Sequence, residues 1–309
     1  MSSFKKAVKG PEDLATDFKG VAADLIGSKY EGGIKVFLES EEDVRIFSDH
    51  WFSQYQDKIR FESAEDGDKS GGGGNAVLRK VKAAKENQLI AYGIVDRDTL
   101  FEDNQNIFWE TDDDKFHAAS PYGHSIHVLR RWEMENYLLK PEAFRAELQC
   151  RIHKRSTSAP EITAETLLNY KEDLKKLTAL STVLASKNIP APSEGFGSAI
   201  SGESLHSEIN KFLSTHNITL ESSEFSMDIN KISAFANNEE KTDMLWDKQS
   251  RILDGKRALY KFCSLFNREY QLKGFQYADE VKGCLANRIA SKRELLDEEL
   301  CSAIEQFLK

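Results

Sequence analysis

Residues Leu89-Ile-Ala-Tyr-Gly-Ile-Val-Asp-Arg-Asp98 carry the strongest structural signal in the chain. The apolar run is typical of a strand that is buried on both faces of a parallel sheet. Side chains two apart on a strand point the same way, so Asp96 and Asp98 are expected to project together from its carboxyl end. Carboxylates that close repel each other unless a cation lies beside them, and Mg²⁺ favours such hard oxygen ligands. The alternative is that Asp-Arg-Asp is only a polar turn.

A glutamate occupies the corresponding place after an earlier predicted strand. Ile34-Lys-Val-Phe-Leu-Glu39 has the β-branched and aromatic content of a strand. Ser40 and Asp43 then resemble a capping box at a helix start. An apolar stripe with helical spacing follows at Val44, Phe47 and Trp51. Glu39 therefore stands where ligands bind in open α/β sheets. The alternative is an exposed carboxylate at the end of a strand.

The next segment combines a strand, a run of glycines and a basic helix. Residues 58–63 predict a second strand, and the glycines at 71–74 predict a loop with unusual backbone freedom. A dinucleotide-binding fingerprint fits poorly, because Ala76 stands where a glycine is needed. A helix is expected from Asn75 to about Asn87. Its Lys80 is a candidate nucleic-acid contact, and the alternative is a solvated helix face.

Residues 124–139 predict a fourth strand that runs into a short helix. Glu133 and Glu135 stand there among aromatic and aliphatic residues, which implies partial burial. An unpaired buried carboxylate is costly, so a metal ion or another cation is expected beside one of them. Arg130 and Arg131 offer the alternative of an internal ion pair, and Arg130 is also a candidate nucleic-acid contact.

An acidic connection separates the third strand from the fourth. Residues 99–123 are expected to be irregular, and they contain the run Asp112-Asp-Asp114. A metal site is conceivable there. A solvated loop is the better interpretation, because nothing in the surrounding sequence fixes the geometry of the three carboxylates.

The order of these features predicts an α/β fold with a mostly parallel, Rossmann-like sheet flanked by helices. Residues 1–33 are expected to form a lead-in with a helix from Pro11 to about Leu25, and residues 34–140 the α/β domain. From Pro141 onward, apolar stripes with helical spacing predict a helical C-terminal region over 141–309. These stripes include Leu174, Leu177, Leu180, Phe262, Phe266, Leu300 and Phe307.

Composition limits the class of protein. The chain has 309 residues, of which 40% are hydrophobic and 30% charged, as in a water-soluble globular protein. No run is apolar enough for a membrane helix, and no secretory signal is evident, so a cytoplasmic protein is expected. The four cysteines lack metal-site spacing and are expected to be reduced. The net charge of −9 argues against a general nucleic-acid-coating protein but not against a metal-dependent nuclease.

Three motifs together resemble the TOPRIM domain of topoisomerases, primases, RecR-type proteins and OLD-family nucleases. The segment Phe37-Leu-Glu39-Ser-Glu-Glu-Asp43 is similar to the Glu-Gly-x-x-Asp opening of that family, with Ser40 in place of the usual glycine. Gly93-Ile-Val-Asp96-Arg-Asp98 is similar to its Asp-x-Asp motif. Trp132-Glu-Met-Glu135-Asn-Tyr-Leu-Leu139 resembles a segment of stand-alone TOPRIM-like proteins, among them the AriB effectors of the PARIS anti-phage system. Asp254-Gly-Lys-Arg resembles a helix start in the same group.

The resemblance implies a metal-dependent endonuclease. In TOPRIM nucleases, acids that match Glu39, Asp96 and Asp98 bind one or two Mg²⁺ ions, with Mn²⁺ as a possible substitute. Glu135 would complete the catalytic and metal-binding set, with Glu133 as its rival. Lys256 would contact a phosphate, and its alternative is an ordinary surface lysine. The resemblance to AriB further implies a prokaryotic effector that cleaves host tRNA as a homodimer after release from the ABC-type ATPase AriA.

Three alternatives remain open. An OLD-type nuclease would cut DNA instead of RNA. A non-catalytic TOPRIM subunit would bind nucleic acid or partners without turnover, although a scaffold does not need repelling acids. A receiver-type or phosphatase domain would need an acid pair or a nucleophilic aspartate after the first strand, where this chain offers only Glu39 before Ser40.

Overall fold

The computed structural model describes residues 33–65, 73–152, 161–219, 221–272, 274–277 and 279–309. The expected helix near residues 11–25 and the first glycines of the glycine run lie outside these residues. Within the described residues, no helix is long and apolar enough to cross a membrane. The four cysteines are free thiols, and Cys263 is buried.

A four-stranded parallel sheet forms the centre of the α/β part. Its strands are β1 (Ile34–Leu38), β2 (Ile59–Ser63), β3 (Ala91–Val95) and β4 (Ile126–Val128), in the order β2-β1-β3-β4. The neighbouring strands are parallel throughout, which confirms the predicted α/β class with a parallel sheet. Parallel strands end at the same edge, so the segments that follow β1, β3 and β4 emerge side by side.

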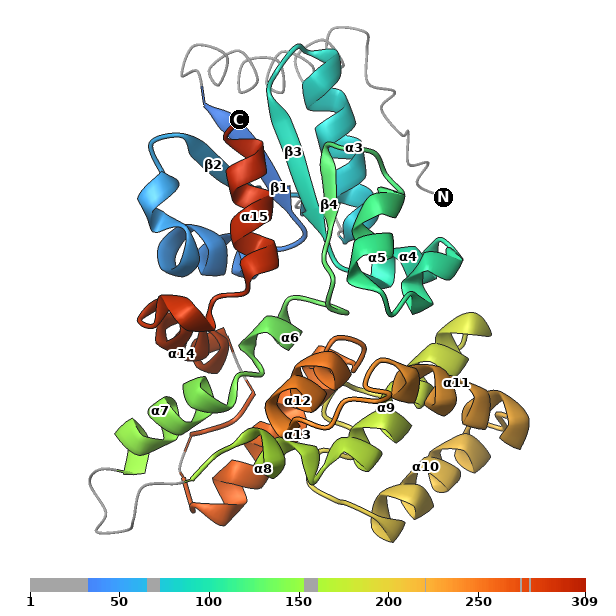
Figure 1. The fold of residues 1–309 in the computed structure, drawn as a ribbon. Coiled ribbons are helices and arrows are strands. Elements are labelled where there is room, and N and C mark those ends of the chain that lie inside the picture. Colours follow the sequence, from blue (N-terminus) through green and yellow to red (C-terminus); the bar gives the residue numbers. More distant parts are fainter. Residues whose placement is uncertain (1–32, 66–72, 153–160, 220, 273, 278) are drawn as a thin grey trace, which may run out of the picture.

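Helices cover both faces of this sheet. Val77 and Val81 of α3 (Gly74–Glu86) lie over Gly93 on one face. On the other face, the ring of Tyr92 stacks on Phe307 of α15 (Glu298–Phe307), with centroids 4.4 Å apart. Adjacent strand residues face opposite sides, so α3 and α15 form the outer layers of an α/β/α arrangement (Figure 1).

The helix after β1 begins as the sequence indicates. Ser40 caps α2 (Glu41–Arg45) in a capping box with Asp43. The chain continues as a π-helical segment, η1 (Ile46–Trp51), and a short 3₁₀ turn, η2 (Ser53–Tyr55). The predicted apolar stripe faces inward, and the ring of Phe47 packs 5.7 Å from that of Phe61 on β2. The helix start was predictable, but its widening into a π-helix was not.

The expectation of an irregular connection over residues 99–123 is wrong. This segment contains α4 (Asp98–Glu102), the 3₁₀ turn η3 (Asn106–Trp109) and α5 (Asp113–Ala119). Its aspartates are not simply solvated, because Asp112 caps α5 and Asp113 forms ion pairs with two arginines. Acidic residues favour the first turn of a helix, so an acidic run can mark a helix start as well as a loop.

The helical region was expected to begin at Pro141, and helices dominate the described chain from residue 135 onward. They are α6 (Glu135–Leu138), α7 (Pro141–Ile152), α8 (Ala164–Leu168), α9 (Lys171–Ser186), α10 (Glu203–Thr215), α11 (Ser222–Ala234), α12 (Thr242–Ser250), α13 (Gly255–Glu269), α14 (Asp279–Ala290), the 3₁₀ turn η4 (Arg293–Leu295) and α15. Figure 1 shows α8 to α13 gathered beyond the carboxyl ends of the strands. A main hydrophobic core includes residues of both the sheet and these helices, and α15 returns to the sheet.

Candidate functional site

The carboxyl edge of the sheet brings three predicted acids together. Glu39 follows β1 and Asp96 follows β3, and the backbone N–H of Asp96 donates to Glu39 Oε1 over 2.8 Å. The hydroxyl of Thr99 donates to the same oxygen over 3.4 Å. Asp98 is the first residue of α4 rather than a strand residue. The turn into that helix, and not strand alternation as expected, therefore places Asp98 near Asp96.

The segment after β4 adds Glu133 and Glu135, which are 3% and 5% exposed. Asn136 fixes this segment: its Oδ1 accepts from the N–H of Glu133 over 2.9 Å. Its Nδ2 donates to the carbonyls of Ser250 and Leu253, each over 2.7 Å. The Glu-Asn-Tyr motif thus has a physical role, because the buried amide ties the two glutamates to the chain that leads into α13.

Asp43 belongs to the same group of acids, which we call the acid cluster: Glu39, Asp43, Asp96, Asp98, Glu133 and Glu135. Asp43 Oδ2 accepts from the N–H and the hydroxyl of Ser40, over 3.1 and 2.7 Å. Its negative charge also acts on the carboxyls of Glu39 and Asp96. Sequence analysis assigned Asp43 only to a helix cap and to the family's opening motif, so its place beside the other acids was missed.

Burial and mutual repulsion change the acidity of these groups. Burial, followed by neighbouring negative charge, raises the pKa of Glu39 to about 7, that of Asp98 to about 8 and that of Asp43 to about 6. The same causes raise the pKa values of Asp96 and Glu133 well above their usual range. The protein environment therefore disfavours ionisation of these carboxyls, and a bound cation would favour their ionised form.

Two lysines from the C-terminal helices partly offset this charge. Lys256, near the start of α13, donates its N–H to Glu133 Oε1 over 2.6 Å and places Nζ 3.1 Å from Oε2. Lys282 of α14 places Nζ 3.2 Å from Glu135 Oε1. Glu133 foremost, and the other acids after it, raise the pKa of Lys256. The helical region is therefore part of the site.

The chemistry of the acid cluster fits a divalent metal ion. Within the described residues, no hydrogen bond or ion pair reaches the carboxylate oxygens of Asp96 and Asp98, so these oxygens are open acceptors. Hard carboxylate oxygens in excess of local positive charge are what Mg²⁺ selects. In the described part of the chain, no three acids, histidines or cysteines already enclose a metal position. The acid cluster is a set of donors rather than a completed coordination shell.

Two glycines allow helices to approach the acid cluster closely. A Cβ on Gly74, at the start of α3, would lie 2.0 Å from Thr99 Oγ1. A Cβ on Gly255, at the start of α13, would lie 2.4 Å from Asn136 Oδ1. Both helix starts therefore border the acids, and Gly255 brings the neighbouring Lys256 onto Glu133.

The candidate nucleic-acid residues divide into two groups. Lys256 lies at the acid cluster with its side chain 37% exposed. Lys80 instead donates to the carbonyl of Ser63, at the end of β2. Arg130 forms internal ion pairs, but not with Glu133 or Glu135 as its alternative predicted. Its Nη1 lies 2.9 Å from Asp113 Oδ2, and its Nη2 lies 2.7 Å from Asp297 Oδ1. Lys256 is thus a candidate that directly contacts an acid of the cluster.

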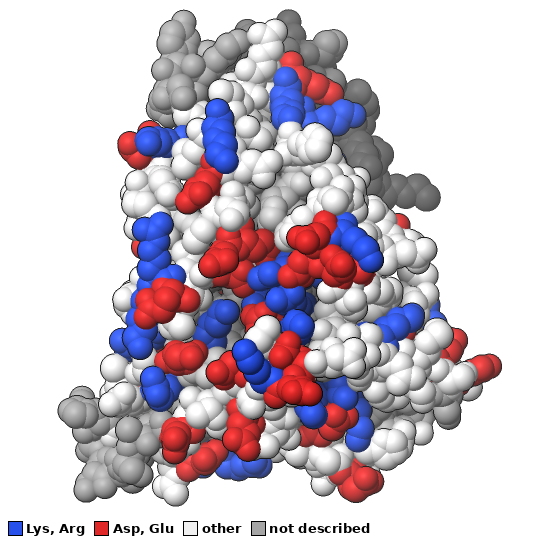
Figure 2. Space-filling model, viewed as in Figure 1, with Lys and Arg blue, Asp and Glu red and all other residues white. Residues whose placement is uncertain are grey.

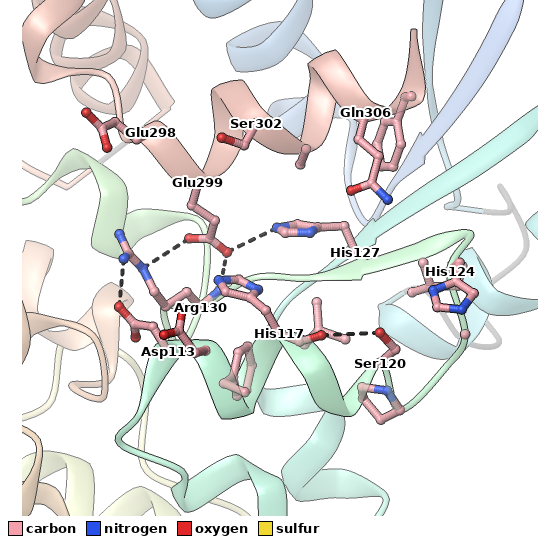
Figure 3. Close-up of a pocket in the computed structure, with 18 residues that line it drawn as sticks. Asp113, His117, Ser120, His124, His127, Arg130, Glu298, Glu299, Ser302 and Gln306 are labelled. Carbon is pink, nitrogen blue, oxygen red and sulfur yellow. Dashed lines mark hydrogen bonds and ion pairs between the residues drawn. The ribbon is translucent and has the colours of Figure 1, made fainter. Parts of the chain in front are cut away.

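Arg130 borders a separate cavity of about 570 Å³ between α5, β4 and α15. Figure 3 shows Glu299 of α15 facing His127 and Arg130 from above the cavity, with His117 nearby. The His127 Nε2 atom lies 3.0 Å from Glu299 Oε1. None of the acids of the cluster lines this cavity. It is thus distinct from the candidate functional site.

Charged side chains mark the level at which the sheet meets the helical region. Figure 2 shows acidic and basic side chains gathered across the middle of one face, between the sheet and the helices beyond it. The described residues at this junction include Arg131, which pairs with Asp247 and Asp297.

No protein-family model matches the chain, and no curated protein matches it in sequence.

Proposed function

We propose that this protein is a metal-dependent phosphodiesterase that cleaves nucleic acid, with the acid cluster as its active site. The observation that carries the proposal is the convergence of Glu39, Asp96 and Asp98 at one edge of a parallel sheet, with the carboxylates of the two aspartates open. Acids with unsatisfied charge are unfavourable in a fold unless a cation compensates them.

Glu39, Asp96 and Asp98 are the residues that would hold Mg²⁺, with Asp43 beside them. Glu133 and Glu135 are engaged by lysines, which suits them to position those lysines. Bound Mg²⁺ would stabilise the charge that develops on a phosphate and lower the pKa of an attacking water.

The chain's own residues supply positioning around these acids. Asp96 N–H and Thr99 fix one oxygen of Glu39, and among the described residues no hydrogen bond or ion pair reaches its Oε2. Glu133 holds Lys256 by both its N–H and its ammonium, so the exposed part of that side chain is oriented at the edge of the acid cluster. An ammonium held there is suited to contact a phosphate oxygen of a nucleic-acid backbone.

The resemblance of the three motifs to TOPRIM domains supports a finer proposal. The parallel sheet flanked by helices is compatible with that fold. By resemblance to the AriB effectors, the substrate is host tRNA, and the active form is a homodimer released from an AriA-like ATPase. The same site on an OLD-type enzyme would instead cut DNA, so the substrate arms of the test decide between them.

The test is incubation of the purified chain with total tRNA and with plasmid DNA, each in Mg²⁺ and in EDTA. We expect Mg²⁺-dependent cleavage of tRNA that Asp96→Asn reduces by at least about a hundredfold. Asp57→Asn is the matched control, because Asp57 is exposed and precedes the amino end of β2. Cleavage of DNA alone would favour the OLD-type alternative. Equal cleavage by wild type and Asp96→Asn would contradict the proposed site.

A further inference from the structure

Lys282 is a buried lysine that contacts two segments of the acid cluster, α2 and the start of α6. It is 6% exposed and lies in α14, far along the chain from the sheet. Its Nζ contacts Glu135 Oε1 at 3.2 Å and also pairs with Glu42 Oε2. Glu42 belongs to α2, directly before Asp43, whereas Glu135 opens α6. One ammonium therefore joins α2, which follows β1, to α6, which follows β4.

The charges around this lysine explain why it remains an ammonium. Burial alone would lower the pKa of Lys282, but Glu135 and Glu42 outweigh that effect and raise it. The ring of Tyr277 lies 5.0 Å from Nζ, and its hydroxyl donates to Glu135 Oε1 over 3.2 Å. A buried charge with two carboxylates and an aromatic face is well compensated.

The carboxylates carried by α2 and α6 would otherwise repel each other. Glu135 is the largest source of negative charge acting on Asp43, which itself acts on Glu39 and Asp96. Without a cation between them, like charges in a poorly solvated place push their supporting segments apart. Lys282 lies where it opposes this separation.

Contacts other than those of Lys282 also dock α14. Trp51 of η1 donates its indole N–H to the carbonyl of Ala286 over 3.1 Å. Arg288 pairs with Glu147 of α7 over 3.0 Å. Buried apolar residues of the helix, Val281, Leu285 and Ile289, complete the contact. The ion pairs of Lys282 are therefore directed at the acid cluster and are additional to the packing of α14.

We propose that Lys282 is a positioning residue that clamps α2 to α6 and so sets the spacing of the acids for a divalent ion. The inference rests on the proposed metal site and assigns the C-terminal region a part in it. Residues that orient metal ligands from outside the ligand set commonly change metal affinity by about 10- to 100-fold.

The test compares Lys282→Met, Lys282→Arg and Arg288→Met by Mg²⁺ titration in a calorimeter and by the Mg²⁺-induced shift in melting temperature. We expect Lys282→Met to raise the Mg²⁺ dissociation constant on the order of tenfold. Lys282→Arg should retain most of the wild-type affinity for Mg²⁺, since it keeps the positive charge. Arg288→Met removes an ion pair of the same helix away from the acids and should leave the dissociation constant unchanged.

The outcomes separate this inference from the proposed function. An unchanged Mg²⁺ affinity in a folded Lys282→Met protein, checked by circular dichroism, overturns the clamp. An equal loss of affinity in Arg288→Met also overturns it, because the effect would then reflect the docking of α14. Failure of the wild-type protein to bind Mg²⁺ contradicts the proposed function itself. If Lys282→Met does not fold, Lys282→Gln provides the same comparison.

Discussion

Single residues decide whether the acids meet. Asn136 and Gly255 form the joint between α6 and α13: the amide holds Glu133, and the missing side chain of the glycine leaves room for the amide. Lys256 is the next residue, so its place on Glu133 depends on this joint. The Glu-Asn-Tyr and Asp-Gly-Lys-Arg motifs, noted in the sequence by family resemblance, thus have a structural role in this fold.

Gly255→Ala should damage this joint. The added Cβ would lie 2.4 Å from Asn136 Oδ1 and 3.0 Å from its N, which forces a shift costing about 1–3 kcal/mol in the free energy of unfolding. Gly283→Ala is the matched control: it lies inside α14, and among the described residues outside the helix's own backbone its added Cβ would come nearest to His50 Nε2, at 3.9 Å. That variant should gain up to about 1 kcal/mol from helix propensity. Urea unfolding measures both, and equal effects would contradict the close approach.

At the scale of elements, the sequence predicts most of what carries the site. The strands ending before Glu39 and Asp96, the capped helix start at Ser40 and the helix α3 all follow from residue patterns and capping chemistry. These features are local, and short-range patterns determine them.

What the sequence does not predict is non-local or ambiguous. The helices over residues 98–119 were missed because an acidic run is compatible with both loops and helix starts. Lys282 could not be found, since nothing near it in the chain marks a lysine that will be buried between two glutamates. The packing of α14 against η1, α6 and α7 produces that contact.

At the scale of the whole molecule, an ion-pair network joins the sheet to the C-terminal helices. Arg130 and Arg131, which follow β4, both pair with Asp297, over 2.7 and 3.0 Å. Burial raises the pKa of Asp297, but Arg131 and Arg130 outweigh burial and hold that pKa at about 2. The fold therefore favours the ionised carboxylate more strongly than the unfolded chain does.

The stabilisation by Asp297 should depend on pH. A carboxyl whose pKa is lower in the folded state stabilises the fold above its unfolded pKa, near 4, and loses that effect as the pH falls toward 2. Asp297→Asn should lower the free energy of unfolding by about 2 kcal/mol at pH 6. The gap to wild type should narrow at pH 3. Chemical denaturation at both pH values measures it, and a gap of the same size at both would contradict the assigned ion pairs.

The central claim is that the acids at the carboxyl edge of the sheet hold a divalent ion. Calorimetric titration of Mg²⁺, repeated with Mn²⁺, into the wild-type protein and Asp96→Asn tests it most directly. The account predicts that the wild-type protein binds the ion and that Asp96→Asn, folded to the same extent by circular dichroism, loses this binding. Absence of binding in the wild-type protein, or equal binding in both proteins, would contradict it.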